Sequence, residues 1–192
     1  MGSGGQTPGI NGGSGNDTII CFIFCFSPQT IIEVLENGKL VKKKISLIKE
    51  GEMAQTYNGN SKSLTKVIKI TRNKGIFEFY EFKCKDNTSN IKNITVTGNH
   101  TMIVFGKQNE IQFKNANQIK IGESFRTTDG IFEIFEINKR TMKDCFEIRT
   151  EDGTILANDI LVSTLYSDNS ENKKSFQKIL ESSSNISVEI LN

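Results

Sequence analysis

Residues 31–45 read IIEVLENGKLVKKKI, in which two runs of apolar and charged residues flank the dipeptide Asn37-Gly38. An Asn-Gly pair accepts the positive φ angles of a tight two-residue turn, so the segment predicts a β-hairpin. The second run carries three consecutive lysines, residues 42–44, which indicates a solvated strand edge. This hairpin makes β-structure the first expectation for the chain.

Strand patterns continue along the chain as far as residue 162. Short runs rich in Ile, Val, Phe and Thr recur between turn residues, and the 192 residues include only two prolines. The predicted strands beyond the hairpin cover residues 66–70, 75–82, 94–97, 102–105, 131–137, 145–149, 154–157 and 160–162. Many short strands separated by frequent turn signals predict an all-β domain.

Two short segments interrupt the strand pattern and are similar to each other. Residues 45–50 and 115–119 each predict a single helical turn, and Gly-Glu follows closely at residues 51–52 and 122–123. A repeated Leu/Ile-x-x-Gly-Glu element indicates that the domain consists of two related halves.

The composition argues against several classes of partner. The chain has 24 basic and 22 acidic residues without a clustered basic footprint, so we expect no nucleic-acid partner. The apolar run at residues 18–24 is too short to cross a membrane and lacks the basic start of a signal peptide. Four cysteines and one histidine match neither a disulfide framework nor a zinc site, so no metal or cofactor is expected. A monomer in a reducing, intracellular setting fits this composition.

The composition also divides the chain into three segments. Residues 1–24 are rich in Gly, Ser, Asn and Thr, and we expect a flexible leader and N-terminal flank there. Residues 25–166 hold the strand-rich domain. Residues 167–192 are expected to form a polar linker and C-terminal flank.

Three local patterns lie in order within the strand-rich domain. CFSPQT begins at Cys25, TGNHTMIV covers residues 97–104, and CFEI at residues 145–148 precedes GTILANDILVST at residues 153–164. Together they resemble the Hint superfamily, which comprises inteins, hedgehog autoprocessing domains and bacterial intein-like domains. The resemblance implies an all-β, horseshoe-like Hint fold with pseudo-two-fold symmetry. About forty residues separate the second and third patterns, which leaves no room for an inserted homing endonuclease.

The resemblance implies that Cys25 attacks the carbonyl of Phe24 and converts the peptide bond into a thioester. This reaction requires the thiol to lie beside the amide and the leaving nitrogen to receive a proton. His100 is the obvious proton donor, because no other side chain here has an ordinary pKa near neutrality. Thr97 is expected either to hydrogen-bond the amide that breaks or to hold the imidazole in one tautomer.

The remaining cysteines and nearby acidic residues leave alternatives open. Cys21 repeats the Cys-Phe start and is a rival nucleophile, although it lacks a threonine at the matching distance. Cys84 is interpreted as structural. Glu147 and Cys145 are both candidates for a general acid or base, with Asp144 beside them. A packing role for Cys145 is equally open.

The C-terminal junction differs from that of inteins. Splicing requires a penultimate His and a terminal Asn that cyclises, and the resemblance aligns Ser163 and Thr164 with these positions. Neither side chain has an amide nitrogen, and Leu165, which follows, is no nucleophile. We therefore expect the thioester to undergo hydrolysis or transfer to an acceptor amine or thiol, without Asn-dependent splicing at Thr164. A shifted junction at Asn169-Ser170 is the alternative.

The segments that flank the domain are its expected partners. Residues 186–191, ISVEIL, resemble the first β-strand of ubiquitin-like proteins. This implies the arrangement of ciliate genes in which intein-like domains alternate with ubiquitin-like units. Two other functions stay open: an inactive Hint-fold module for linkage or interaction, and a hydrolase that uses Cys25 and His100 in trans. A substrate tethered directly upstream of Cys25 favours the reaction in cis.

Overall fold

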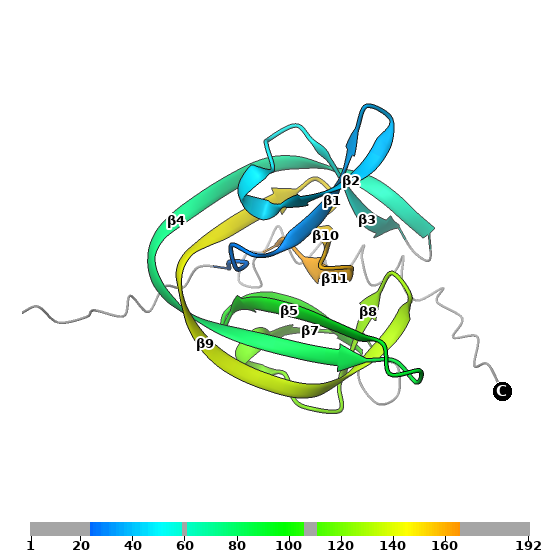
Figure 1. Ribbon diagram of the computed structural model, residues 1–192, viewed down its shortest axis with the longest axis vertical. Helices are drawn as coiled ribbons and strands as arrows, with labels where there is room; N and C mark the ends of the chain where they lie inside the picture. Colours follow the sequence, from blue (N-terminus) through cyan, green and yellow to red (C-terminus); the bar gives the residue numbers. More distant parts are fainter. Residues whose placement is uncertain (1–23, 59–60, 106–110, 166–192) are drawn as a thin grey trace, which may run out of the picture.

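The computed structural model describes residues 24–58, 61–105 and 111–165 (Figure 1). Within these residues one sheet contains β1 (Ile31–Glu36), β2 (Lys39–Lys44), β3 (Met53–Asn58), β4 (Ser61–Lys85), β5 (Ile91–Thr97), β6 (Thr101–Phe105), β7 (Ile111–Asn115), β8 (Ser124–Thr127), β9 (Gly130–Thr150), β10 (Thr154–Ala157) and β11 (Ile160–Ser163). Two 3₁₀ turns, η1 (Ile45–Leu47) and η2 (Ala116–Gln118), follow β2 and β7. The leader, Cys21, the Asn169-Ser170 junction and the segment that resembles a ubiquitin-like strand lie outside the described residues.

The predicted hairpin is confirmed. β1 and β2 pair in antiparallel register up to Glu36 and Lys39, and the turn residues Asn37 and Gly38 have φ angles of 50° and 77°. Both angles lie in the left-handed region that Asn and Gly tolerate best. In the described part of the chain β2 pairs only with β1, so the three lysines do lie at a sheet edge.

β4 and β9 are the longest strands and form the frame of the domain. They pair antiparallel over most of their length and curve along one side of the molecule past both halves (Figure 1). The sequence patterns predicted two strands in place of each, separated at residues 71–74 and 138–144, and this prediction is wrong. Three register shifts, one of them between Asn73 and Ile76, bend the strand pair without ending its pairing.

Each half of the domain repeats the same order of elements. β1, β2, η1, β3 and β4 correspond to β6, β7, η2, β8 and β9. The backbone bonds repeat as well: Gly51 N–H donates to the carbonyl of Val67 at 2.8 Å, and Gly122 N–H donates to that of Ile134 at 2.9 Å. Both glycines have φ near 90°, a conformation that disfavours other residues. The predicted duplication of the short Gly-Glu elements is therefore confirmed.

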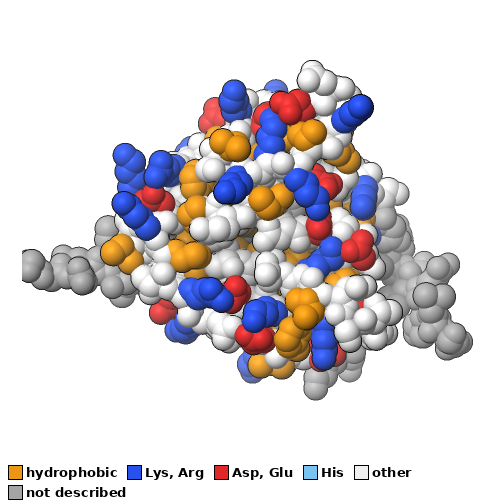
Figure 2. All heavy atoms as spheres, in the orientation of Figure 1, with side chains coloured by type: hydrophobic (Ala, Val, Ile, Leu, Met, Phe, Trp, Pro, Cys, Tyr) orange, Lys and Arg blue, Asp and Glu red, His pale blue; other side chains and the backbone are white. Residues whose placement is uncertain are grey.

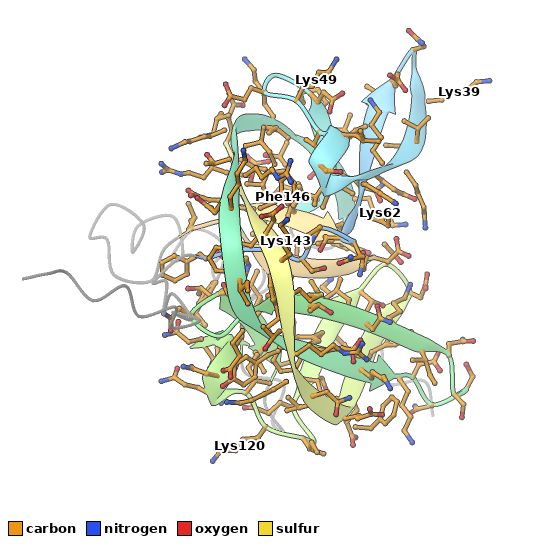
Figure 3. All side chains as sticks on the ribbon, turned by 60° about the vertical axis from the view of Figure 1, so that its left-hand side comes forward. Lys39, Lys49, Lys62, Lys120, Lys143 and Phe146 are labelled. Carbon is orange, nitrogen blue, oxygen red and sulfur yellow. The ribbon has the colours of Figure 1, made fainter. Side chains whose placement is uncertain are left out.

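Phe26 joins the two halves at the centre of the domain. Its N–H donates to the carbonyl of Phe146 at 2.8 Å, and the reverse bond is 3.0 Å long. Phe26 also bridges to Val96 of β5. Figure 3 shows Phe146 midway along the long strands, between the halves. Side chains from both halves pack around Phe26 in one buried core, which includes Ile32, Val34, Phe82, Ile94, Phe125, Phe132 and Ile155.

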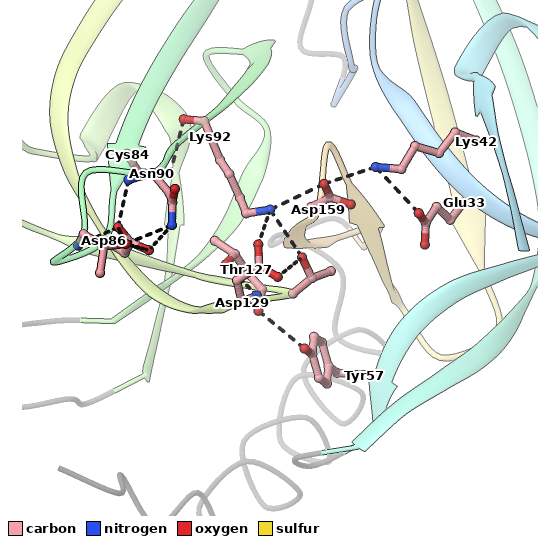
Figure 4. A network of polar contacts seen from close by, with 12 residues as sticks. Glu33, Lys42, Tyr57, Cys84, Asp86, Asn90, Lys92, Thr127, Asp129 and Asp159 are labelled. Atoms are coloured by element: carbon pink, nitrogen blue, oxygen red, sulfur yellow. Dashed lines mark hydrogen bonds and ion pairs between the residues drawn. The ribbon is translucent and has the colours of Figure 1, made fainter. Parts of the chain in front are cut away.

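A polar network also ties the two halves together (Figure 4). Lys92 of β5 lies 2.8 Å from a carboxylate oxygen of Asp129 and 3.4 Å from one of Asp159. The same oxygen of Asp159 forms an ion pair with Lys42 of β2, whose Nζ lies 3.4 Å away. Asp159 has a φ of 64°, a left-handed conformation that aspartate tolerates better than most residues.

Charged side chains of both signs are interspersed on the face of the molecule in Figure 2. This distribution agrees with the near-balance of basic and acidic residues in the chain. Among the described residues, no helix has the length and hydropathy that crossing a bilayer requires.

Candidate functional site

Cys25 lies where the two halves meet, and hydrogen bonds fix its backbone on both sides. Its N–H donates to Oγ1 of Thr97 at 2.9 Å, and the N–H of Thr97 donates to the carbonyl of Cys25 at 2.9 Å. Neither residue is accessible to solvent to any appreciable extent. The N–H of Cys25 belongs to the Phe24–Cys25 peptide bond. Thr97 therefore contacts the amide that the sequence analysis expected to break, which is one of the two arrangements predicted for it.

The sulfur of Cys25 lies in a small buried cluster between the long strands. It shares a hydrogen bond with the thiol of Cys145, and Nδ2 of Asn73 donates to it at 3.4 Å. Phe77 and Phe79 pack against the two thiols. The hydrogen bond with Cys145 and burial raise the pKa of Cys25 well above its ordinary value, while Asn73 acts in the opposite direction. At neutral pH the resting residue is therefore a thiol, which must lose its proton before or during any attack.

His100 is buried and has a defined tautomer. Its Nε2 lies 3.1 Å from the carbonyl oxygen of Ser163, and a carbonyl can only accept, so Nε2 carries the hydrogen. Burial lowers the pKa of His100 to about 4, which keeps the ring neutral at physiological pH. Nδ1 is then an unprotonated acceptor, and it has no hydrogen-bond partner among the described residues. The ring packs edge-on against Phe26, with 4.4 Å between centroids.

Thr97 and His100 are held by one tight turn. The N–H of His100 donates to the carbonyl of Thr97 at 2.9 Å, and the same bond recurs between Thr30 and Ser27 at 3.1 Å in the first half. The carbonyls of Thr30 and His100 in turn accept the N–H groups that begin η1 and η2. The candidate catalytic turn is therefore one copy of a duplicated structural element.

The third pattern brings Cys145 into the buried cluster that holds the sulfur of Cys25. Glu147 lies two residues further along β9, and its charge contributes to raising the pKa of Cys25. Asp144 has a different partner: its carboxylate lies 2.6 Å from the guanidinium of Arg72 and accepts the N–H of Gly75 at 3.2 Å. Asp144 thus stabilises the bulged strand pair beside the site.

Two further residues are placed by the fold. Cys84 is buried in the main core and its thiol donates to the carbonyl of Lys92 at 3.6 Å, as suits the structural role predicted for it. Asn73 was not predicted as a site residue. Its only signal is a polar residue that interrupts an apolar strand pattern, which was interpreted as a break between strands.

Ser163 and Thr164 are both buried at the end of β11. Oγ1 of Thr164 lies 2.9 Å from that of Thr150, whose own hydroxyl donates to the carbonyl of Thr154 at 3.0 Å. A hydroxyl has one hydrogen, so Thr164 must be the donor to Thr150. The hydroxyl of Ser163 accepts the N–H of Leu165 at 3.0 Å. Both hydroxyls therefore stabilise the backbone of this junction.

Comparisons with known proteins agree on one fold. No protein-family model matches the chain, and no curated protein matches its sequence. An intein from a hyperthermophile superposes with a TM-score of 0.63 at 14% identity, over 72% of this chain and 98% of that one. A DnaB intein from Synechocystis sp. PCC 6803 superposes with a TM-score of 0.57 at 18% sequence identity, over 72% of this chain and 96% of that one. A bacterial intein-like domain from Clostridium thermocellum superposes with a TM-score of 0.57 at 18% sequence identity, over 73% of this chain and 99% of that one.

These matches cover almost the whole length of each related structure, so they concern the complete domain. At 14% to 18% identity the likeness lies in the path of the backbone. The strand-rich duplicated architecture and the long β4–β9 pair are consistent with it. The chain therefore has the Hint fold, which it shares with inteins and with a bacterial intein-like domain.

Proposed function

We propose that the domain cleaves its own chain through an N-to-S acyl shift at the Phe24–Cys25 peptide bond. One observation carries this proposal: the N–H of that bond donates to Oγ1 of Thr97 at 2.9 Å in a buried position, and the residue that supplies this N–H, Cys25, also carries the thiol. An amide held in one orientation beside its nucleophile needs no bimolecular encounter, which removes a large entropic part of the barrier.

In the proposed step the sulfur of Cys25 attacks the carbonyl carbon of Phe24. As the S–C bond forms, the C–N bond breaks and the nitrogen becomes the free α-amine of Cys25. The thiol gives up one proton and the nitrogen gains one. We assign this transfer to His100, because a neutral ring with an unprotonated Nδ1 can accept the proton and return it. Cys145 and Glu147 stay candidates for a supporting acid or base, and the thiol contact favours Cys145.

The thioester would then react with water or with an acceptor amine or thiol. Asn-dependent cyclisation is excluded by the side chains at the junction, because neither Ser163 nor Thr164 has an amide nitrogen. The hydroxyl of Thr164 donates to Thr150 and accepts the N–H of that residue at 3.3 Å, which further commits it to a structural role. The proposed substrate is thus the domain's own upstream flank.

Incubation of the purified chain with a strong thiol or hydroxylamine should release a fragment that ends at Phe24. Intact mass measurement should show this fragment together with a domain that begins at Cys25, since at neutral pH both reagents cleave thioesters and leave ordinary peptide bonds intact. The first-order rate constant should not change with protein concentration, as expected for a reaction in cis. If refolded protein released nothing after prolonged incubation, the inactive Hint-fold module would be the better description. A rate proportional to concentration would favour hydrolysis in trans.

Replacing Ser163 by His and Thr164 by Asn together should introduce cleavage before Leu165. The asparagine supplies the cyclising nitrogen, and the histidine supplies a proton to the leaving amine. Ligation should still fail because Leu165 offers no nucleophile. Mass spectrometry should find a fragment with a C-terminal succinimide in the double variant and not in either single variant. A spliced product from the unmodified chain, or a succinimide at Asn169, would contradict the assignment of this junction.

A further inference from the structure

Among the described residues, Asn73 is the polar side chain outside the three sequence patterns that contacts the sulfur of Cys25. Nδ2 of Asn73 lies 3.4 Å from Sγ, a normal distance for an N–H donor and a sulfur acceptor. Asn73 stands directly opposite Cys145 in the β4–β9 register. The two long strands therefore each direct one side chain to the same sulfur atom.

The backbone around Asn73 is fixed by a local distortion of the strand pair. The register between β4 and β9 shifts between Asn73 and Ile76. Asp144 has a φ of 62° at this place, and its carboxylate binds both Arg72 and the backbone N–H of Gly75. A bulge of this kind changes the direction of a side chain without ending the pairing of its strand. The ion pair and the bulge together hold Asn73 beside the thiol.

The cluster around the sulfur otherwise opposes loss of its proton. Phe77 and Phe79 pack against the buried thiol, and the contact with Cys145 and the charge of Glu147 both raise the pKa of Cys25. Asn73 acts in the opposite direction: its side-chain N–H donates to the sulfur and lowers the pKa of Cys25. A donor bonds more strongly to a thiolate than to a neutral thiol, because the bond becomes charge-assisted.

We propose that Asn73 is a catalytic residue whose side-chain N–H stabilises the negative charge that develops on Sγ of Cys25 as the thiol loses its proton. This inference rests on the acyl shift proposed above. In that step Asn73 supplies a hydrogen-bond donor to the sulfur. Because the sulfur is buried, water cannot take this role.

Three variants measured beside the wild type test the inference. Asn73→Ala removes the donor and should slow thiol-induced release about tenfold, as expected when one charge-assisted hydrogen bond is lost. Asn73→Asp keeps the shape of the side chain but places a carboxylate against the sulfur, so it should be slower than Asn73→Ala by a further severalfold. Lys74→Ala changes the exposed neighbour in the same bulge and should react at the wild-type rate. Thermal unfolding of each variant checks that the fold is retained.

The order of the rates separates a role in catalysis from a role in packing. If Asn73 only filled space, the isosteric Asn73→Asp would retain more activity than Asn73→Ala, and that order would overturn the inference while leaving the proposed function intact. Equal rates for wild type and Asn73→Ala would overturn it as well. A wild-type chain that released nothing would refute the proposed function, and the role of Asn73 in it. Slowing in the order wild type, Asn73→Ala, Asn73→Asp supports the inference.

Discussion

Replacing Cys25 by Ala should abolish thiol-induced release of the upstream segment, with a loss of at least about 10³-fold, the scale seen when a catalytic nucleophile is removed. The reason is chemical: without sulfur no thioester forms, and neither reagent attacks an ordinary amide at a useful rate. The measurement is intact mass after incubation with thiol or hydroxylamine. Cys25→Ser should be strongly slowed rather than silent, because a hydroxyl is a weaker nucleophile than a thiol.

Two matched controls accompany this variant. Cys21→Ala removes the rival nucleophile and should leave release unchanged, because no threonine stands at the matching distance behind it. Cys84→Ala removes another buried thiol, one that belongs to the main core, so it should lower thermal stability more than it lowers the rate. If the Cys21 variant were the inactive one, the register of the first sequence pattern would be wrong. Release by the Cys25→Ala chain would rule out Cys25 as the nucleophile.

Replacing His100 by Ala should slow release by roughly a hundredfold or more, the usual contribution of a positioned general acid or base. The ring is neutral at physiological pH and its Nδ1 is unprotonated, so we expect it to accept the thiol proton and deliver it to the leaving nitrogen. The measurement is the first-order rate of thiol-induced release at constant pH. An unchanged rate would remove His100 from the mechanism.

His100→Gln separates proton transfer from positioning of the junction. A glutamine amide can still donate to the carbonyl of Ser163, but it cannot carry a proton between two groups. We therefore expect His100→Gln to be as slow as His100→Ala. Recovery of the wild-type rate in His100→Gln would mean that the histidine acts only by holding Ser163. Cys145 or Glu147 would then be the candidate for the residue that transfers the proton.

A comparison of the wild type with His100→Gln also tests whether the ring of His100 is buried. The pKa of His100 is about 4 in the folded chain against 6.5 for an unhindered histidine, so the unfolded chain binds a proton that the folded chain rejects. This preference for the neutral ring favours folding above pH 6.5 and is lost as the pH falls toward 4. Wild type should therefore lose stability relative to His100→Gln over this interval. The free energies of unfolding in urea at a series of pH values measure this difference.

The sequence by itself determined the elements that depend on neighbouring residues. Asn37-Gly38 predicted the first hairpin, because positive φ angles are a local property of those two residues. The repeated Gly-Glu elements predicted the duplication, since each glycine is required by its own turn. The strands β3, β7 and β8 were not predicted, because their mixed polar composition gives a weak period of two.

Tertiary structure alone decided which side chains meet at Cys25, Thr97 at its backbone N–H and Asn73 at its sulfur. The contact from Thr97 spans 72 positions of the chain and that from Asn73 spans 48. The resemblance to the Hint superfamily supplied Thr97, whereas nothing in the sequence singled out Asn73. The direction of the Asn73 side chain depends on a bulge, and the position of Cys145 opposite Asn73 depends on the register of β9 against β4. Strand register is set by pairing between distant segments, so local sequence patterns do not encode it.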